Sequence, residues 1–230
     1  MEASANRVDI RKIAVVAMLC AIAYALLAAS KLIPFLNFIP SVGFLRYDPK
    51  DIIIVIGAFM MGPLTGAVVS VIVSLVEMVT LSVTGPIGCV MNILSSCAFA
   101  CTAAAIYKKK RDMRGAVIGL AAGVIATTAV MLLWNYFLTP IYQGWPRSAV
   151  AALLIPGFLP FNLIKGSLNM ALTLLLYRPL VTALRSARLL PHSASGGTVK
   201  SAKVTLGVSL VALLILISCV LLILVLRGII

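Results

Sequence analysis

A lysine and an asparagine interrupt a long apolar stretch of this sequence, where polar side chains are costly. Lys165 lies near the start of an apolar run at about residues 149–177, and Asn162 precedes it by three residues. On a helix, residues three apart share a face, so both side chains would point the same way. A lysine at the centre of a membrane helix costs roughly 2.5–3.5 kcal/mol on insertion scales, and less where its ammonium group snorkels to the headgroups. We favour a contact with a polar ligand over snorkelling for Lys165.

Two further amides stand near the ends of apolar runs. Asn135 lies between Trp134 and Tyr136, shortly before Pro140, which we expect to end its helix. An amide supplies two donors and one acceptor, which suits the edge of a polar heterocycle, and aromatic rings beside it can stack on that ligand. Asn135 could instead bond a neighbouring helix, and so could Asn92 near the start of an earlier run. We interpret both as candidate ligand contacts at the level of Asn162.

Acidic residues are few, and a carboxylate in or beside an apolar run requires a polar or cationic partner. Asp51 begins an apolar run, and its carboxylate could accept from the free amides at a helix N-terminus, so we interpret it as a helix cap. Asp48 could form an ion pair within its loop, with Arg46 or Lys50. Glu77 is the one acid deep inside an apolar stretch, where it needs a cation or a polar partner. It could line a site or contact another protein, and the residues do not choose between these.

Several kinds of chemistry lack their motifs. The sequence contains no Gly-x-x-x-x-Gly-Lys-Ser/Thr phosphate loop, no His-Glu-x-x-His, no Gly-x-Ser-x-Gly and no paired aspartates within an apolar run. Its one histidine, His192, has no cysteine or acidic residue near it along the chain. The sequence therefore predicts neither an enzyme nor a metal site, and no hydrolysis of ATP by this chain alone.

The elements that carry these residues are membrane helices. The 230 residues are 62% hydrophobic and 11% charged, against roughly 25% charged in average soluble domains. Backbone amides in hydrocarbon must pair internally, and long apolar runs without strict alternation favour helices over a barrel. We predict an all-α, polytopic membrane helix bundle with a core of six helices and one extra C-terminal helix. The expected runs are at about 12–30, 51–65, 66–84, 87–107, 115–138, 149–177 and 204–226.

The net charge of +13 indicates topology rather than nucleic-acid binding, because the basic residues fall in short segments between apolar runs without interleaved aromatic residues. If the N-terminus is cytoplasmic, 13 of the 19 lysines and arginines fall on the cytoplasmic side and 5 on the outer side, with Lys165 inside a helix. The positive-inside rule favours this orientation. We expect a multi-pass protein of the cell membrane with a cytoplasmic N-terminus.

Composition also divides the chain. A segment rich in serine and glycine separates the six-helix domain from a last apolar run, which is typical of a flexible linker. We expect a six-helix membrane domain at 1–188, a cytoplasmic linker at 189–203 and an appended transmembrane helix at 204–230. The first helix carries Ala17, Ala21 and Ala25 at four-residue spacing, and small residues so placed allow close approach of another helix.

Five segments in order resemble the riboflavin-binding S component of energy-coupling-factor (ECF) transporters, over about residues 10–185. They are Leu45-Arg46-Tyr47-Asp48-Pro49-Lys50-Asp51, Gly62-Pro63 with Gly66, Gly85-Pro86-Ile87-Gly88 leading to Asn92, Asn135-Tyr136 with Thr139-Pro140, and Pro160-Phe161-Asn162-Leu163-Ile164-Lys165-Gly166. The usual pattern of this family has six helices, so the run at 204–226 departs from it.

The resemblance implies a subunit that captures riboflavin outside the cell and joins a transmembrane coupling subunit and two cytoplasmic ATPases. It implies that Asn135, Asn162 and Lys165 line the vitamin site and that the loop of Leu45 closes over it. It also implies that the Ala17–Ala21 face meets the coupling subunit. Two alternatives stay open: an S component for another vitamin, such as thiamin or biotin, and a membrane scaffold protein without transport.

Overall fold

Helices form most of the chain that the structure describes, as a membrane requires of a backbone whose polar groups cannot pair with water. The computed structural model describes residues 10–33, 36–186 and 202–228, and this part of the chain contains no strand. The predicted all-α fold is confirmed. The α-helices are α1 (Ile10–Lys31), α2 (Lys50–Met61), α3 (Pro63–Thr80), α4 (Gly85–Lys110), α5 (Met113–Gln143), α6 (Arg147–Leu153), α7 (Leu159–Ser186) and α8 (Ala202–Leu226), with short helical turns η2 (Pro40–Val42) and η3 (Leu154–Phe158).

Six helical segments of the described chain are long and apolar enough to cross a membrane. They are Ile10–Lys31, Pro63–Thr80, Gly85–Lys110, Met113–Gln143, Arg147–Tyr177 and Leu206–Leu226. Helix α2 is the exception, because its 12 residues extend about 18 Å at 1.5 Å per residue, well short of the ~30 Å hydrocarbon core. The long loop that precedes α2 therefore enters the bundle at the depth where α2 begins.

The break between α2 and α3 falls earlier than the sequence boundary at 65 and 66. Gly62 adopts φ 104°, a conformation that favours glycine, and Pro63 is the first residue of α3. Proline suits a first helical position because its missing N–H would have no partner there. The two expected runs are therefore separate helices, with the break about three residues before their approximate boundary.

Helix α5 does not end at Pro140, contrary to the expectation from sequence. It continues through Pro140 to Gln143 and ends at Gly144, which has φ 68°. A glycine in the left-handed conformation is a common helix stop, whereas a proline in a membrane helix is tolerated when neighbouring groups satisfy the backbone. Asn135 consequently lies two turns inside α5 rather than at its end.

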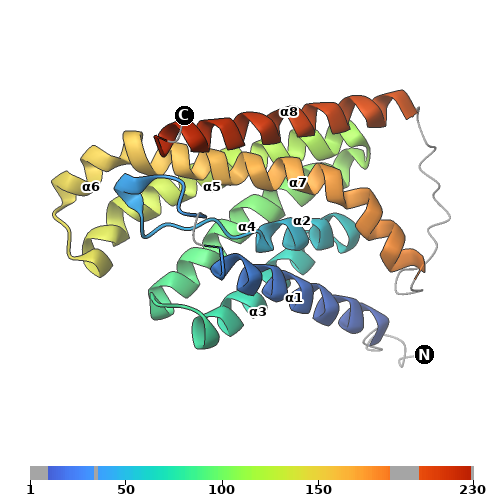
Figure 1. The fold of residues 1–230 in the computed structure, drawn as a ribbon. Coiled ribbons are helices and arrows are strands. Elements are labelled where there is room, and N and C mark those ends of the chain that lie inside the picture. The colour runs from blue at the N-terminus through green and yellow to red at the C-terminus, as the bar shows by residue number, and fades with distance from the viewer. Residues whose placement is uncertain (1–9, 34–35, 187–201, 229–230) are drawn as a thin grey trace.

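The two ends of the bundle are formed by different segments of the chain (Figure 1). One end, here termed the loop end, is formed by residues 32–33, 36–49, 81–84 and 144–158, which lie between α1 and α2, between α3 and α4, and between α5 and α7. The opposite end holds the start of α1, the break at Gly62 and the turn between α4 and α5. Helix α8 packs along α7, and its C-terminus reaches the loop end.

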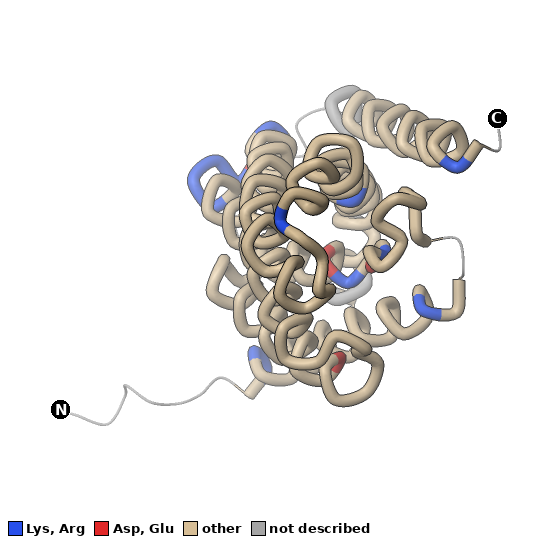
Figure 2. Tube along the Cα trace, turned by 90° about the vertical axis from the view of Figure 1, so that its left-hand side faces the viewer, with Lys and Arg blue, Asp and Glu red and all other residues tan. Residues whose placement is uncertain are grey.

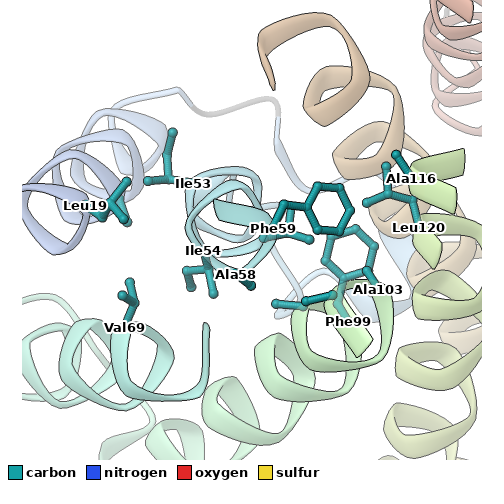
Figure 3. Close-up of a cluster of buried hydrophobic side chains, with 14 of the residues drawn as sticks. Leu19, Ile53, Ile54, Ala58, Phe59, Val69, Phe99, Ala103, Ala116 and Leu120 are labelled. Atoms are coloured by element: carbon teal, nitrogen blue, oxygen red, sulfur yellow. The ribbon is translucent and has the colours of Figure 1, made fainter. Parts of the chain in front are cut away.

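The apolar core lies between α1, α2, α3, α4 and α5 (Figure 3). Leu19 of α1, Ile54 of α2 and Phe99 of α4 are buried there. Helices α4 and α5 come closest where Gly119 and Gly123 face α4, since a Cβ on either glycine would lie 2.6 or 2.7 Å from a backbone oxygen of that helix. Small residues at a helix interface permit such close approach and strengthen packing in a membrane.

Larger residues at these two glycines should destabilise the protein. We expect Gly119→Val and Gly123→Val each to lower the free energy of unfolding by roughly 1–3 kcal/mol, because the helices must separate to admit the side chain. Equilibrium unfolding in detergent micelles measures the change. Gly207→Val in α8 is the control, since no atom lies within 4 Å of the added Cβ there. Equal stability of all three variants would contradict the packing described for α4 and α5.

Candidate ligand-binding site

A cavity of about 130 Å³ lies at the loop end, between the loop that precedes α2 and helices α1, α3, α4, α5 and α7. Its walls include all five residues that the sequence suggested as ligand contacts: Leu45, Asn92, Asn135, Asn162 and Lys165. These residues come from the loop and three different helices, so only the fold brings them together. Their contact with a ligand stays a prediction.

Asn135 and Asn162 are buried and make the same local bond. Asn135 Nδ2 donates to the carbonyl of Met131 at 2.7 Å, and Asn162 Nδ2 donates to the carbonyl of Phe158 at 2.8 Å. In both cases the acceptor is one helical turn back, and the bond uses one of the two N–H groups of the amide. Thr139 Oγ1 also donates to Asn135 Oδ1 at 2.9 Å. Both amides are thus held in fixed orientations on the cavity wall.

Asn92 has a different environment, because its amide joins α4 to α3. Its Nδ2 donates to Glu77 Oε2 at 2.8 Å. Glu77 also lines the cavity, which answers the question that the sequence left open about its place. At this point the cavity wall carries a carboxylate as well as an amide.

Glu77 is paired with Lys50, a buried lysine for which the sequence suggested only Asp48 as a partner. Lys50 Nζ lies 2.6 Å from Glu77 Oε2, and the Lys50 side chain is 1% exposed. Lys31 Nζ, at the end of α1, lies 3.6 Å from Glu77 Oε1. An acid deep in an apolar stretch requires a cation nearby, so Glu77 itself was the signal for such a partner. Sequence alone could not identify which lysine it is.

Lys165 does not snorkel, because its ammonium group faces two carboxylates. Lys165 Nζ lies 3.4 Å from Asp48 Oδ2 and 3.6 Å from Asp51 Oδ2, and its side chain is 12% exposed. The snorkelling alternative is therefore wrong. The ion pairs compensate the burial of the charge while the side chain still lines the cavity.

Asp48 connects the two lysine sites, since Lys50 Nζ lies 3.8 Å from its Oδ2. Burial alone would raise the pKa of Asp48, but Lys165, Lys50 and Lys31 together bring that pKa below its ordinary value. A lowered pKa means that Asp48 stays ionised at neutral pH. Figure 2, viewed from the loop end, shows acidic and basic positions side by side within the ring of helices.

The predicted cap role of Asp51 is wrong. Asp51 is the second residue of α2, and the residue before the helix, Pro49, makes no side-chain cap bond. The carboxylate instead accepts from Ser96 Oγ at 2.5 Å and from Asn169 Nδ2 at 3.3 Å. It points into the bundle because partners on α4 and α7, including Lys165, compensate its burial there.

The alanine face of α1 lies on the surface. Ala17, Ala21 and Ala25 are exposed, whereas Leu19 and Ala23 on the other side of the helix are buried in the core. A surface of small side chains allows another membrane helix to approach closely. Contact of this face with a partner stays a prediction.

Membrane helices that enclose a polar, charge-lined cavity at one end define a ligand-binding membrane protein. The family model described as "ECF transporter, substrate-specific component" matches residues 11–177. The chain belongs to this family of transporter components, which is not a class of enzymes, and the resemblance noted in the sequence is confirmed at this level.

Curated relatives and a solved structure agree with this assignment. The riboflavin transporter RibU of Staphylococcus aureus (strain TCH60) is 33% identical over 181 residues, covering 76% of this chain and 93% of that protein. The riboflavin transporter FmnP of Bacillus subtilis (strain 168) is 30% identical over 195 residues, covering 78% and 98%. The solved structure described as "Structure and mechanism of the S component of a bacterial ECF transporter" has a TM-score of 0.64 and 32% identity, covering 76% and 98%.

The pair of Lys50 and Glu77 should contribute strongly to stability. We expect Lys50→Met to lower the free energy of unfolding by roughly 3–5 kcal/mol, because it leaves a buried carboxylate without its nearest cation. The double variant Lys50→Met/Glu77→Gln should lose less than the sum of the single losses, by roughly 0.5–3 kcal/mol.

Equilibrium unfolding of the four proteins in a double-mutant cycle measures the coupling. Lys31→Met is the control, because this lysine is 32% exposed and lies at 3.6 Å from Glu77, so its loss should cost no more than about 1 kcal/mol. Strictly additive losses for Lys50 and Glu77 would show that the pair is not coupled.

Proposed function

We propose that this chain is the riboflavin-binding S subunit of an ECF transporter, which captures riboflavin at the outer face of the cell membrane and mediates its uptake. The observation that carries the proposal is that Leu45, Asn92, Asn135, Asn162 and Lys165 line one cavity. The relatives named riboflavin transporters support the choice of vitamin.

The cavity has the chemistry that an isoalloxazine ring requires. Asn135 and Asn162 present oriented amides to the carbonyl and N–H groups at the polar edge of the ring system. Phe44 and Phe161 line the same cavity and offer apolar faces for the flat rings. Lys165, Asp48 and Glu77 supply charged donors and acceptors for the hydroxyl groups of the ribityl chain. Binding needs no covalent step and no cofactor, so riboflavin is cargo.

The chain draws its energy from partners. Because the sequence has no phosphate loop, ATP is hydrolysed by two cytoplasmic ATPase subunits, and a transmembrane coupling subunit transmits the change. The exposed face of Ala17, Ala21 and Ala25 is where the coupling subunit docks. In this arrangement residues 1–188 are the substrate-binding domain and 204–230 an appended helix. His192 and most of the predicted linker at 189–203 lie within residues 187–201, outside the described part of the chain.

The loop end faces the exterior and the N-terminus lies in the cytoplasm. The charge distribution supports this orientation, since the basic residues of the α4–α5 turn, from Lys108 to Arg114, lie at the opposite end of the bundle. The positive-inside rule places such a cluster in the cytoplasm. The cavity would then open toward the vitamin outside the cell.

Loss of either cavity amide should weaken riboflavin binding. We expect Asn135→Ala and Asn162→Ala each to raise the Kd about 5- to 150-fold, because one hydrogen bond in a poorly solvated site contributes roughly 1–3 kcal/mol. Stability of the unliganded protein should change little, since each amide bonds within its own helical segment. Quenching of riboflavin fluorescence measures the Kd.

Gln143→Ala is the matched control, because this amide ends α5 outside the cavity lining. Competition by thiamin and biotin tests the choice of vitamin. If neither cavity variant alters the Kd, or if thiamin or biotin displaces riboflavin at equal concentration, the proposed site or ligand is wrong.

The orientation has its own test. With the five native cysteines replaced by alanine, Arg147→Cys at the loop end should react with a membrane-impermeant maleimide on intact cells. Lys109→Cys at the opposite end should react only after the membrane is permeabilised, because we expect it in the cytoplasm. Labelling of Lys109→Cys from outside would reverse the topology.

A further inference from the structure

Helix α8 lies outside the region that defines the family, yet it contacts the loop that lines the cavity. The family match ends at residue 177, and α8 spans Ala202–Leu226. Just after α8, Arg227 donates from Nε to the carbonyl of Asn37 at 3.2 Å and from Nη2 to the same oxygen at 2.7 Å. Arg227 and Asn37 are 190 residues apart, so this contact joins the end of the described chain to the loop between α1 and α2.

The carbonyl that Arg227 binds belongs to the base of a closed loop. Asn37 Nδ2 donates to the carbonyl of Gly43 at 2.8 Å, and the Tyr47 amide donates to the carbonyl of Leu36 at 2.9 Å. These bonds make residues 36–47 one unit, termed here the cavity loop. Phe44, Leu45 and Arg46 from its second half line the cavity. A displacement of Asn37 would therefore also shift the loop residues that line the cavity.

Apolar side chains of α8 support the same loop from outside. Cys219 is buried in a cluster with Phe38, Ile39 and Leu45 of the cavity loop, and Ile215 and Ile223 pack against this cluster. Most other described side chains of α8 are exposed, with Ala212 and Cys219 as the buried ones. The buried and half-buried side chains of α8 thus lie toward α7 and the cluster that contains the cavity-loop residues.

We propose that α8 is a positioning element that holds the cavity loop in its ligand-binding conformation, with Arg227 as the positioning residue. A loop fixed before the ligand arrives loses less conformational entropy on binding, which raises affinity. The competent fraction of loop conformations sets the apparent Kd, so weakening the contact should raise that Kd and speed dissociation. The effect on the ligand rests on the proposed riboflavin function, whereas the effect on the loop does not.

A second explanation for Arg227 is that it only anchors the end of α8 at the membrane surface, as basic residues at helix ends commonly do. That explanation predicts that loss of Arg227 changes the placement or insertion of α8 without changing hydrogen exchange around Asn37. The forked contact to one backbone carbonyl distinguishes the two. Arg227→Gln removes the two guanidinium N–H groups that bind the Asn37 carbonyl. Arg227→Lys keeps the positive charge and an N–H donor, so the lysine variant should preserve the position of the cavity loop in part.

The experiment compares the full-length protein with Arg227→Gln by hydrogen exchange of residues 37–47 and by the rate of riboflavin dissociation. We expect exchange in the cavity loop to accelerate about 10- to 150-fold without ligand, with a similar increase in the dissociation rate, as for loss of a hydrogen bond to a charged group. Arg147→Gln is the matched control, since it removes an exposed arginine of α6 at the same end of the bundle.

An independent pair of variants tests the apolar part of the contact. Ile223→Ala removes a side chain that packs on the loop cluster, and Leu222→Ala removes an exposed neighbour of similar size. Only Ile223→Ala should accelerate exchange in the cavity loop. Unchanged exchange in both Arg227→Gln and Ile223→Ala would overturn the inference. If exchange accelerates but the unaltered protein does not bind riboflavin, the proposed ligand is wrong and the positioning role of α8 stands.

Discussion

The arrangement of this protein depends on a set of buried charges that compensate one another. Lys50, Lys31 and Lys165 face Asp48, Asp51 and Glu77, so three cations balance three carboxylates at the depth where α2 begins. An unpaired buried charge in this setting would cost several kcal/mol, so Lys50, Lys165 and their carboxylates require one another, whereas Lys31 is 32% exposed and contributes less. The set joins α1, α2, α3 and α7 to Asp48, which directly follows the cavity loop, and so holds the walls of the cavity together.

Much of this architecture could be predicted because it follows from local pattern. Apolar runs near membrane length predicted the helices, and the cost of burying Lys165 or Asn162 marked them as informative. Resemblance to the riboflavin-binding S component agrees with the family match. The errors were local too: Pro140 and Asp51 carry sequence signals for a helix stop and a helix cap, but α5 continues to Gln143 and the Asp51 carboxylate accepts from Ser96 of α4.

What the sequence could not supply is the pairing of distant residues. Lys50 and Glu77 are 27 residues apart, Lys165 and Asp48 are 117 apart, and Arg227 and Asn37 are 190 apart. No periodicity or spacing specifies such partners, since one lysine in a loop resembles any other until the fold buries it. The sequence therefore suggested only Asp48 as a partner for Lys50, and no role for the last helix.

The cavity loop lines the site together with helices and the residues 82–84 between α3 and α4, and it is held from two sides. Inside the bundle, Asp48 follows the loop directly and bonds Lys165, while Tyr47 Oη donates to Asn169 Oδ1 at 2.8 Å. Outside, Arg227 bonds the carbonyl of Asn37 at the base of the loop, and Ile223 of α8 packs against the apolar cluster that includes Phe38, Ile39 and Leu45 of the loop. The inner partners Lys165 and Asn169 lie within residues 11–177, the part of the chain that matches the family model, whereas α8 lies beyond it. The proposed outer support therefore acts on the cavity loop without contributing a residue to the cavity lining.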